Sequence, residues 1–245
     1  MHKKKILITG ATSGLGLHMT KLCLAKGYEV YATGRNEVSL TTLEKLGAHP
    51  IQADLREMEQ IDALLQQLPK LDVAIINAGV GIFENAFHLT DEQIDTMIDV
   101  NVKAPIFLAK RLFANMQKEG HFIFISSQAG KVATKKASVY AATKHALTGF
   151  IDGFRHEAAP LKVTGIFPGP IDTPFLQKAD AAGAYRQAIA HFLLTPEKVA
   201  NAVIKTIERP VRSVNLPWAM GLTSKLYAIA PTLVEKLGSN FFNKK

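Results

Sequence analysis

The sequence of 245 residues is poor in several residue types, and each shortage excludes a class of protein. It has a single cysteine, Cys23, so no disulfide can form within the chain and a small disulfide-stapled fold is excluded. Charged residues make up only 20% and hydrophobic residues 47%, which excludes a disordered chain. No apolar run approaches the roughly 18 to 20 residues of a membrane-spanning helix. The length then leaves one large or two modest globular domains.

The N-terminus shares only its positive charge with a signal peptide. Met1-His2-Lys3-Lys4-Lys5 is basic, but the apolar run after it, Ile6-Leu7-Ile8, is too short for the apolar region of such a peptide. Together with the lone cysteine, this predicts a cytoplasmic protein.

Positive charge is in excess, since 29 Lys and Arg against 21 Asp and Glu give +8. Such an excess raises nucleic acid or an anionic membrane surface as a partner. From Thr195 onward there are eight Lys or Arg and three Glu, so this stretch supplies +5 of the +8. Aromatic and basic residues are not interleaved, and no recognition helix is evident, so we expect no nucleic-acid partner.

The eight histidines show no metal-ligand spacing, so we expect no metal site.

Short apolar segments alternate along the chain with longer amphipathic segments. The apolar segments are mostly continuous, as in strands that are covered on both faces. Repeated strand–helix–strand units predict an α/β fold, a doubly wound, Rossmann-type parallel sheet of about seven strands with helices on both faces. The predicted strands are Lys5–Thr9, Glu29–Thr33, His49–Gln52, Val73–Asn77, His121–Ser126, Lys162–Phe167 and Arg212–Leu216. The predicted helices are Leu15–Ala25, Leu40–Leu46, Ile61–Leu68, one from the capping box at Thr90 toward Asn101, Pro105–Met116, Val139–Ala158 and Pro196–Ile207.

No linker or repeat marks a boundary, so residues 1–245 are predicted to form one dinucleotide-binding catalytic domain. Within it, residues 172–192 are expected to border the substrate, and residues 217–245 to form a C-terminal helical extension. In the extension Trp218, Leu222, Leu226 and Ile229 recur at helical spacing, and Phe241-Phe242-Asn243-Lys244-Lys245 ends the chain. Such a segment can pack on the domain or on a partner subunit, which is favoured, or cover the substrate, or lie on a membrane.

A glycine-rich turn, Thr9-Gly10-Ala11-Thr12-Ser13-Gly14-Leu15-Gly16, joins the first strand to the first helix. Glycines here let the backbone approach a pyrophosphate, which the helix N-terminus attracts. The spacing is Gly-x3-Gly-x-Gly and not the general Gly-x-Gly-x-x-Gly.

At the end of the second strand, where NAD sites usually carry an acidic residue, Gly34 is followed by Arg35. A guanidinium suits a 2′-phosphate, so NADP is favoured over NAD.

Tyr140 and Lys144 are four residues apart in a helical pattern and so share one face. At about 4–5 Å, the ammonium would lower the pKa of the phenol by about 2–3 units from its usual value near 10, before burial opposes this. The phenol would then approach the working range of a general acid–base. Ser127 lies thirteen positions earlier, at the end of an apolar strand whose carboxyl end faces the expected ligand crevice.

Together these motifs resemble the short-chain dehydrogenase/reductase family from about Lys4 to Ile207. The matching residues are Thr9-Gly-x3-Gly-x-Gly16, Asp54, Asn77-Ala78-Gly79, Asn101, Ser127, Tyr140-x-x-x-Lys144 and Pro168-Gly169 with Thr173. The resemblance implies that Tyr140 is the acid–base, that Ser127 holds the substrate oxygen, and that Lys144 binds the nicotinamide ribose. Asn101 would support a water-mediated proton path to Lys144. The implied cofactor-binding residues are Gly10, Thr12, Ser13, Gly14, Leu15, Gly16, Arg35, Asp54, Leu55, Asn77, Ala78, Gly79, Tyr140, Lys144, Pro168, Gly169, Ile171 and Thr173.

The implied function is hydride transfer between NADP(H) and a small-molecule carbonyl or alcohol. Phe83, Phe175 and Leu176 border the expected pocket, so the substrate is expected to be largely apolar. The alternative is a catalytically silent protein of the same fold that binds or senses a dinucleotide.

Two departures from the family bear on the cofactor preference and on the oligomeric state. Ser13 stands where some NADP-preferring members carry a basic residue, and the last strand lacks the Asp-Gly-Gly segment of many tetramers. A homodimer through the helices near Ile106 and Phe150 is therefore expected.

Overall fold

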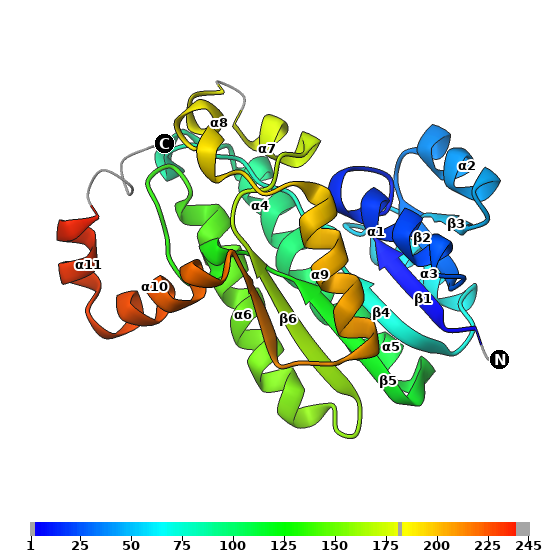
Figure 1. Ribbon diagram of the computed structural model, residues 1–245. Coiled ribbons are helices and arrows are strands. Elements are labelled where there is room, and N and C mark those ends of the chain that lie inside the picture. The colour runs from blue at the N-terminus through cyan, green and yellow to red at the C-terminus, as the bar shows by residue number, and fades with distance from the viewer. Residues whose placement is uncertain (1–2, 181–182, 239–245) are drawn as a thin grey trace.

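The computed structural model describes residues 3–180 and 183–238, in which seven strands form one parallel sheet (Figure 1). The strand order is β3-β2-β1-β4-β5-β6-β7, so the direction of winding reverses between β1 and β4. This confirms the predicted doubly wound fold. The strands are β1 Lys5–Thr9, β2 Glu29–Gly34, β3 His49–Gln52, β4 Leu71–Ile76, β5 Met116–Ile125, β6 Lys162–Pro168 and β7 Ser213–Leu216.

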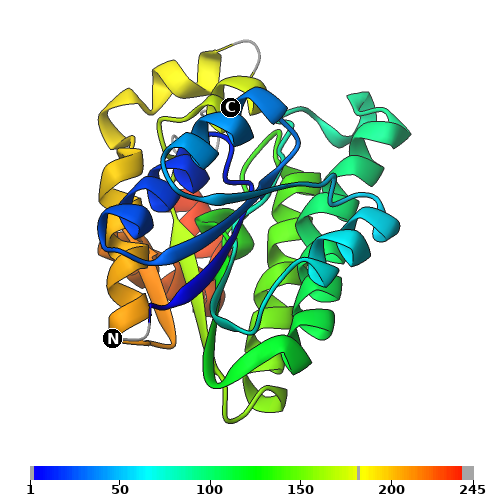
Figure 2. The same cartoon turned by 90° about the vertical axis from the view of Figure 1, so that its right-hand side faces the viewer.

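Helices cover both faces of the sheet (Figure 2). The α-helices are α1 Gly14–Ala25, α2 Glu37–Lys45, α3 Met58–Gln66, α4 Asp91–Ile98, α5 Ala104–Leu112, α6 Ser138–Glu157, α7 Pro174–Ala179, α8 Ala184–Ala188, α9 Pro196–Glu208, α10 Trp218–Ile229 and α11 Pro231–Leu237. Short single turns η1 Ala86–His88, η3 Phe113–Asn115, η4 Gln128–Gly130 and η5 Ala190–Phe192 lie between them. In the part of the chain that is described, none of the helices is both long and apolar enough to cross a bilayer.

The continuous apolar strands divide their side chains between two cores. In β1, Leu7 packs with α3, α5 and α6, while Ile6 and Ile8 on the opposite face pack with α1 and α9. Successive side chains of a strand point to opposite faces, so a run without polar residues fills both layers. All three side chains are fully buried. This explains why the strands lack the alternation of a sheet with one wet face.

The helix that was expected to close at Asn101 continues instead into α5. A wider π-helical turn, η2 Asp99–Lys103, joins α4 to α5. Pro105 follows this turn, and a proline has no N–H to donate to the carbonyl four residues earlier, here that of Asn101. The α-helical pattern is therefore interrupted at Asn101 without ending, and π turns of this kind occur often at functional sites. The helix then ends at Leu112 and not at Met116, because Met116 already pairs with Leu71 in the sheet.

Two of the predicted regions are described only in part. Residues 172–192, expected to border the substrate, hold α7, α8 and η5, and residues 181–182 lie outside the described residues. The extension predicted over 217–245 folds as α10 and α11, which project from one side of the molecule in Figure 1. Phe241, Phe242, Lys244 and Lys245 lie outside the described residues.

Candidate active site

A cavity of about 1080 Å³ lies beyond the carboxyl ends of the strands. Ligands of doubly wound sheets bind at this edge. The predicted site residues that line the cavity are Gly10, Thr12, Ser13, Gly14, Leu15, Gly16, Arg35, Asp54, Leu55, Asn77, Ala78, Gly79, Ser127, Tyr140, Lys144, Pro168, Gly169, Ile171 and Thr173. Of the predicted set, only Asn101 does not line it, and its side chain is fully buried.

The turn from β1 into α1 depends on the absence of side chains. Gly10 and Gly14 have φ angles of +65° and +49°, in the left-handed region that favours glycine. A Cβ on Gly16 would lie 2.1 Å from the carbonyl oxygen of Gly10 and 2.8 Å from Nδ2 of Asn77. Helix α1 therefore packs directly against the end of β1, and its N-terminal N–H groups face the cavity edge where a pyrophosphate would be attracted.

Asn77 joins the ends of the two strands at the reversal of winding. Its Nδ2 donates to the Thr9 carbonyl at 2.8 Å, and its backbone N–H donates to Thr9 Oγ1 at 2.9 Å. The hydroxyl of Thr9 also accepts from the N–H of Ala78 at 3.0 Å. These bonds fix Asn77-Ala78-Gly79 beside the glycine turn and shape the floor of the cavity.

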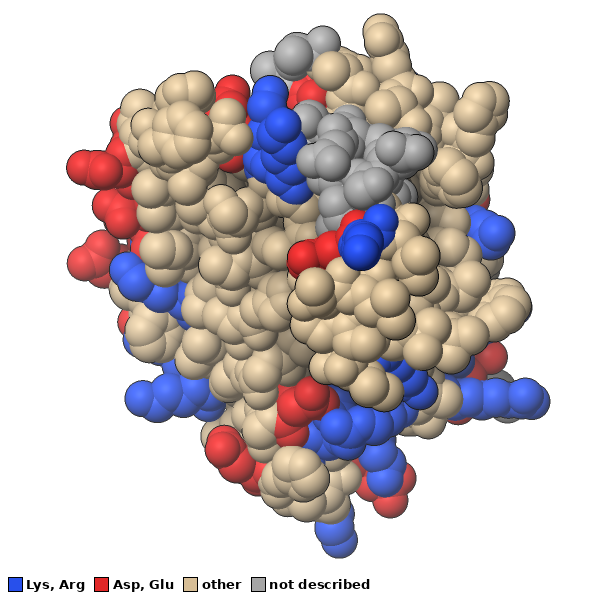
Figure 3. Space-filling model, turned by 90° about the vertical axis from the view of Figure 1, so that its left-hand side faces the viewer, with Lys and Arg blue, Asp and Glu red and all other residues tan. Residues whose placement is uncertain are grey.

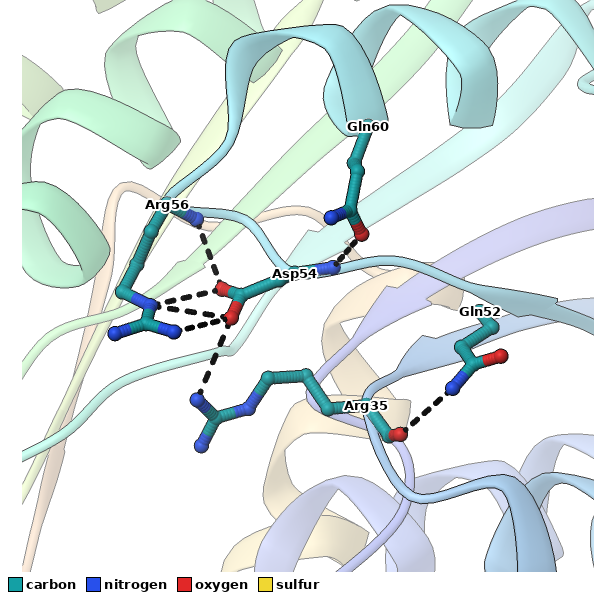
Figure 4. Close-up of polar contacts among 5 residues, drawn as sticks. All are labelled: Arg35, Gln52, Asp54, Arg56 and Gln60. Atoms are coloured by element: carbon teal, nitrogen blue, oxygen red, sulfur yellow. Dashed lines mark hydrogen bonds and ion pairs between the residues drawn. The ribbon is translucent and has the colours of Figure 1, made fainter.

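At the far end of the cavity, two arginines approach the carboxylate of Asp54 from different sides (Figure 4). Arg56 is held closely, with Nη2 at 2.8 Å from Oδ2 and its backbone N–H donating to Oδ1. Arg35 is held loosely, with Nη1 at 3.6 Å and 61% of its side chain exposed. Burial acts to raise the pKa of Asp54, but the hydrogen bonds and charge of Arg56, with the charge of Arg35, hold it below its usual value. Asp54 is therefore charged at neutral pH. Its closer partner, Arg56, was not predicted from the sequence, although it lies only two positions away.

Tyr140 lies near the start of α6 and is almost completely buried. Burial raises the pKa of Tyr140 to about 12, and a hydrogen bond with Ser127 acts in the opposite direction. The lowered pKa expected from Lys144 is therefore wrong for this structure. Its physical reason is that burial disfavours the phenolate more strongly than its neighbours favour it. The phenol is instead a neutral hydroxyl at neutral pH, directed to the same cavity as Ser127.

Lys144 is one turn further along α6 and is likewise buried. Its Nζ lies 5.9 Å from the centre of the Tyr140 ring and donates to the carbonyl of Ile125 at 3.4 Å. Burial lowers the pKa of Lys144 to about 8. A Cβ on Gly79 would lie 3.4 Å from this Nζ, so the glycine leaves room for the ammonium.

Asn101 lies behind the cavity wall and ties three segments together. Its Oδ1 accepts from the N–H of Val80 at 2.9 Å, and its Nδ2 donates to the carbonyl of Val80 at 2.8 Å and to Thr143 Oγ1 at 3.0 Å. The hydroxyl of Thr143 in turn donates to the carbonyl of Tyr140 at 2.7 Å. Asn101 therefore positions the loop after β4 against helix α6. Its expected part in a proton path stays a prediction.

Aromatic side chains surround the Tyr140 end of the cavity. Phe83 meets the Tyr140 ring edge-on at 5.6 Å between centroids, and Phe175 lies at 5.9 Å. Tyr185 meets Phe83 at 5.5 Å, and burial raises the pKa of Tyr185 to about 12. Phe83, Phe175 and Leu176 line the cavity as predicted, whereas Tyr185 was missed because α8 carries no motif.

The loop that carries Ser127 is anchored by contacts that no pattern in the sequence indicates. Gln128 donates through Nε2 to the carbonyl of Phe167 at 2.7 Å and to Oδ1 of Asn215 at 3.1 Å. Lys131 donates to the same Oδ1 at 2.6 Å and lies over the Phe167 ring at 3.8 Å. Asn215 lies on β7, about 90 positions from the serine, and only the fold brings them together.

Pro217, Ala219, Met220, Thr223, Tyr227 and Val234 also line the cavity, so α10 and α11 form one of its walls. A Cβ on Gly169 would lie 2.9 Å from Met220 Sδ, which places α10 against the end of β6. No cluster of three or more His, Cys, Asp or Glu that could hold a metal ion occurs among the described residues.

Comparisons with known proteins show the family and agree with the fold. A family model described as short chain dehydrogenase matches residues 4–183. The uncharacterized oxidoreductase YxnA of Bacillus subtilis is 30% identical over 253 residues, covering 95% of this chain and 70% of the relative. Among solved structures, the closed form of a serine dehydrogenase complexed with NADP+ is 31% identical, with a TM-score of 0.80 over 86% of this chain and 93% of that one. A serine dehydrogenase from Escherichia coli is 29% identical, with a TM-score of 0.75 over 86% and 96%.

Proposed function

Because the chain belongs to the short-chain dehydrogenase/reductase family, we propose that it is an NADP(H)-dependent oxidoreductase that interconverts a carbonyl compound and its alcohol. One observation carries the proposal: Ser127, Tyr140 and Lys144 line the same cavity as the glycine turn after β1. A dinucleotide on that turn would extend along the strand ends toward the two hydroxyls.

The residues at both ends of the cavity fit a dinucleotide phosphate. The close approach of Gly16 to Gly10 leaves open backbone at the N-terminus of α1, which suits a pyrophosphate. At the other end, Arg35 is exposed and only loosely engaged by Asp54, so its guanidinium is available to a 2′-phosphate. The serine dehydrogenase structure that resembles this chain was solved with NADP+, which supports the same preference.

NADPH, when bound, supplies the hydride that reduces a carbonyl carbon. Negative charge then develops on the carbonyl oxygen, and the hydroxyls of Ser127 and Tyr140 would stabilise it as hydrogen-bond donors. Tyr140 gives its proton to that oxygen and Ser127 keeps its own. The buried ammonium of Lys144 stabilises the phenolate that remains.

At neutral pH Tyr140 of the free protein is in the form that donates a proton, as carbonyl reduction requires. Proton donation needs the neutral phenol, and burial raises the pKa of Tyr140 to about 12, so this form predominates. Alcohol oxidation needs the phenolate to accept the proton, and that form is scarce below about pH 10.

The proposed substrate class is a largely apolar ketone or aldehyde. Phe83, Phe175, Leu176 and Tyr185 contribute carbon surface next to Tyr140. The similarity to serine dehydrogenases raises a small 3-hydroxy acid as the competing class. A panel of apolar ketones, aldehydes and 3-hydroxy acids including serine, assayed by NADPH or NADP absorbance, separates the two.

The experiment that tests the activity is the variant Tyr140→Phe. It removes one hydroxyl, so NADPH binding should survive while turnover of any accepted substrate falls by about 100-fold or more. Unchanged turnover in this variant would refute the assignment. If the native chain binds NADPH but turns over no member of the panel, the alternative of a silent dinucleotide-binding or sensing protein is favoured.

We further propose a homodimer and a cytoplasmic location. Ile106, Phe113, Phe150 and Phe154, together with Lys110 and Glu157, line a shallow hollow of about 290 Å³ beside α5 and α6, and its aromatic side chains suit a second copy. The lone Cys23 is buried, which is consistent with a reducing compartment. Sedimentation of the native chain and of Phe113→Asp tests the dimer, which should dissociate in the variant.

A further inference from the structure

Helices α10 and α11 present an apolar surface to solvent that nothing in the described chain covers. Of the twelve large apolar side chains exposed in the described part, six lie on these two helices. They are Trp218, Leu222, Leu226, Ile229, Leu233 and Leu237. Trp218, Ile229 and Leu237 are 77%, 82% and 81% exposed. Large contiguous apolar surface of this kind marks an interaction site.

The two sides of this helix pair have different surroundings. On the inner side, Met220, Tyr227 and Val234 line the active-site cavity, and Gly221 packs so closely on Asn215 that a Cβ would lie 2.8 Å away. The inner side thus satisfies the expectation that the segment packs on its own domain. The outer side, with Leu222, Leu226 and Ile229, is left for a partner.

Charge identifies the kind of partner. Within Trp218–Leu237 the charged residues are Lys225, Lys236 and Glu235. Glu235 accepts a hydrogen bond from the hydroxyl of Tyr227 at 2.7 Å. The two lysines are exposed, and against the one glutamate they leave these helices with a net positive charge. Figure 3 looks onto this side of the molecule: a broad area with few charged side chains is edged below by basic side chains with acidic ones among them.

A second copy of the chain does not fit this pattern well. In a symmetric contact the same patch meets itself, so two patches of the same net positive charge would face each other. Charge complementarity then does not favour the pairing. An anionic bilayer surface instead offers negative headgroups to the lysines and acyl chains to the apolar side chains.

We infer that the outer face of α10 and α11 docks on the surface of an anionic lipid bilayer. The helices would lie in the headgroup region without crossing the bilayer, and Trp218 suits that region because its ring is apolar while its N–H is polar. Phe192, which is also exposed, lines the same cavity as the inner face, so the cavity mouth would lie close to the lipid. This surface goes beyond the proposed oxidoreductase activity and does not depend on it.

Trp218 is the only tryptophan of the sequence, so its fluorescence reports on this face alone. The experiment mixes the full chain with vesicles of phosphatidylcholine, with and without phosphatidylglycerol, and follows both the emission maximum and co-sedimentation. We expect a shift to shorter wavelength and sedimentation with the anionic vesicles. No shift and no sedimentation with either vesicle would overturn the inference. A shift that follows protein concentration and ignores lipid would assign the face to a second copy, and equal binding to both vesicles would refute the anionic partner.

The double variant Leu226→Glu/Ile229→Glu should weaken vesicle binding by about 100-fold or more, because it removes two large apolar side chains from the face. NADPH binding by the variant checks that the domain is folded, since neither residue lines the cavity. Val38→Glu is the matched control, because Val38 is 78% exposed on α2, away from this face, and should leave vesicle binding unchanged. Equal binding by all three chains would overturn the inference without bearing on turnover.

Discussion

Asn101 donates a hydrogen bond to Thr143, which lies on α6 between Tyr140 and Lys144. Thr143 in turn donates a hydrogen bond to the carbonyl of Tyr140. The π turn that holds Asn101 is thus linked, through one hydroxyl, to the helix that carries the two reactive side chains. Thr143 is not in the cavity and acts only by fixing their position.

Replacing Thr143 by Val should lower kcat by about tenfold and leave NADPH affinity unchanged, because Nδ2 of Asn101 loses a buried partner and α6 is less firmly held. Thr143→Ser keeps the hydroxyl and should restore the rate. Thr206→Val is the matched control, since Thr206 is a buried helical threonine that donates to the carbonyl three residues earlier on α9. An equal loss of kcat in both valine variants would contradict the positioning role.

Gly16→Ala should destabilise the protein by about 1–3 kcal/mol, because its Cβ would overlap the carbonyl oxygen of Gly10. The shift of the turn should also weaken NADPH binding, measured by cofactor fluorescence. Gly149→Ala on α6 is the control, since no atom lies within 4 Å of the added Cβ. That variant should be neutral or more stable by about 0.5–1 kcal/mol in thermal unfolding. Normal cofactor binding by Gly16→Ala would show that the turn tolerates a side chain.

Arg35→Ala should lower the ratio of kcat/KM with NADPH to that with NADH by roughly 10- to 100-fold, the effect of losing a charge-assisted bond to the 2′-phosphate. Arg56→Ala should instead affect both cofactors alike, because Arg56 is engaged by Asp54. If the ratio does not move in Arg35→Ala, the assignment of Arg35 is refuted.

His121 makes the folded protein sensitive to mild acid. Burial, with the charges of Lys4 and Lys162, lowers the pKa of His121 from 6.5 to about 4. The unfolded chain therefore takes up this proton first, and stability falls as the pH drops through the window from about 6.5 to about 4. Between about pH 7.5 and pH 5 the loss is about 2 kcal/mol.

Residue 121 cannot titrate in His121→Gln. The free energy of unfolding of this variant, measured with urea, should therefore fall by about 2 kcal/mol less than that of the native chain between about pH 7.5 and pH 5. The carboxylates contribute equally to both chains. Parallel stability–pH curves for the two chains would contradict the buried, neutral histidine.

The pKa of Tyr140 predicts opposite pH dependences for the two directions of the reaction. Since kcat/KM reports the ionisation of the free enzyme, alcohol oxidation should rise from about pH 6 to about pH 8, above which Lys144 loses its proton. Carbonyl reduction should stay level over the same range. Initial rates in both directions across this range are the measurement. Oxidation that levels off near neutral pH would show that the phenol titrates far below about 12.

The sequence predicted those features of the fold and the site that depend on residues close together in the chain. Strands such as Ile6-Leu7-Ile8 and the turn around Gly16 were foreseen because burial and close backbone approach leave direct marks on residue type. The anchor of the Ser127 loop on Asn215 was not, because polar residues far apart in the chain carry no sign of their pairing. The direction of the Tyr140 pKa shift was also missed, since spacing gives the distance to Lys144 but not the extent of burial.

The end of β2 limits how the cofactor preference of this chain could change. A Cβ on Gly34 would lie 2.6 Å from Cγ2 and 2.7 Å from Oγ1 of Thr12, so the threonine occupies the space that a side chain at position 34 would need. The acidic residue that would favour NAD belongs at that position. A route to NAD therefore involves residue 12 as well as residue 34, because the side chain of Thr12 has to move or become smaller before an acidic side chain fits beside it.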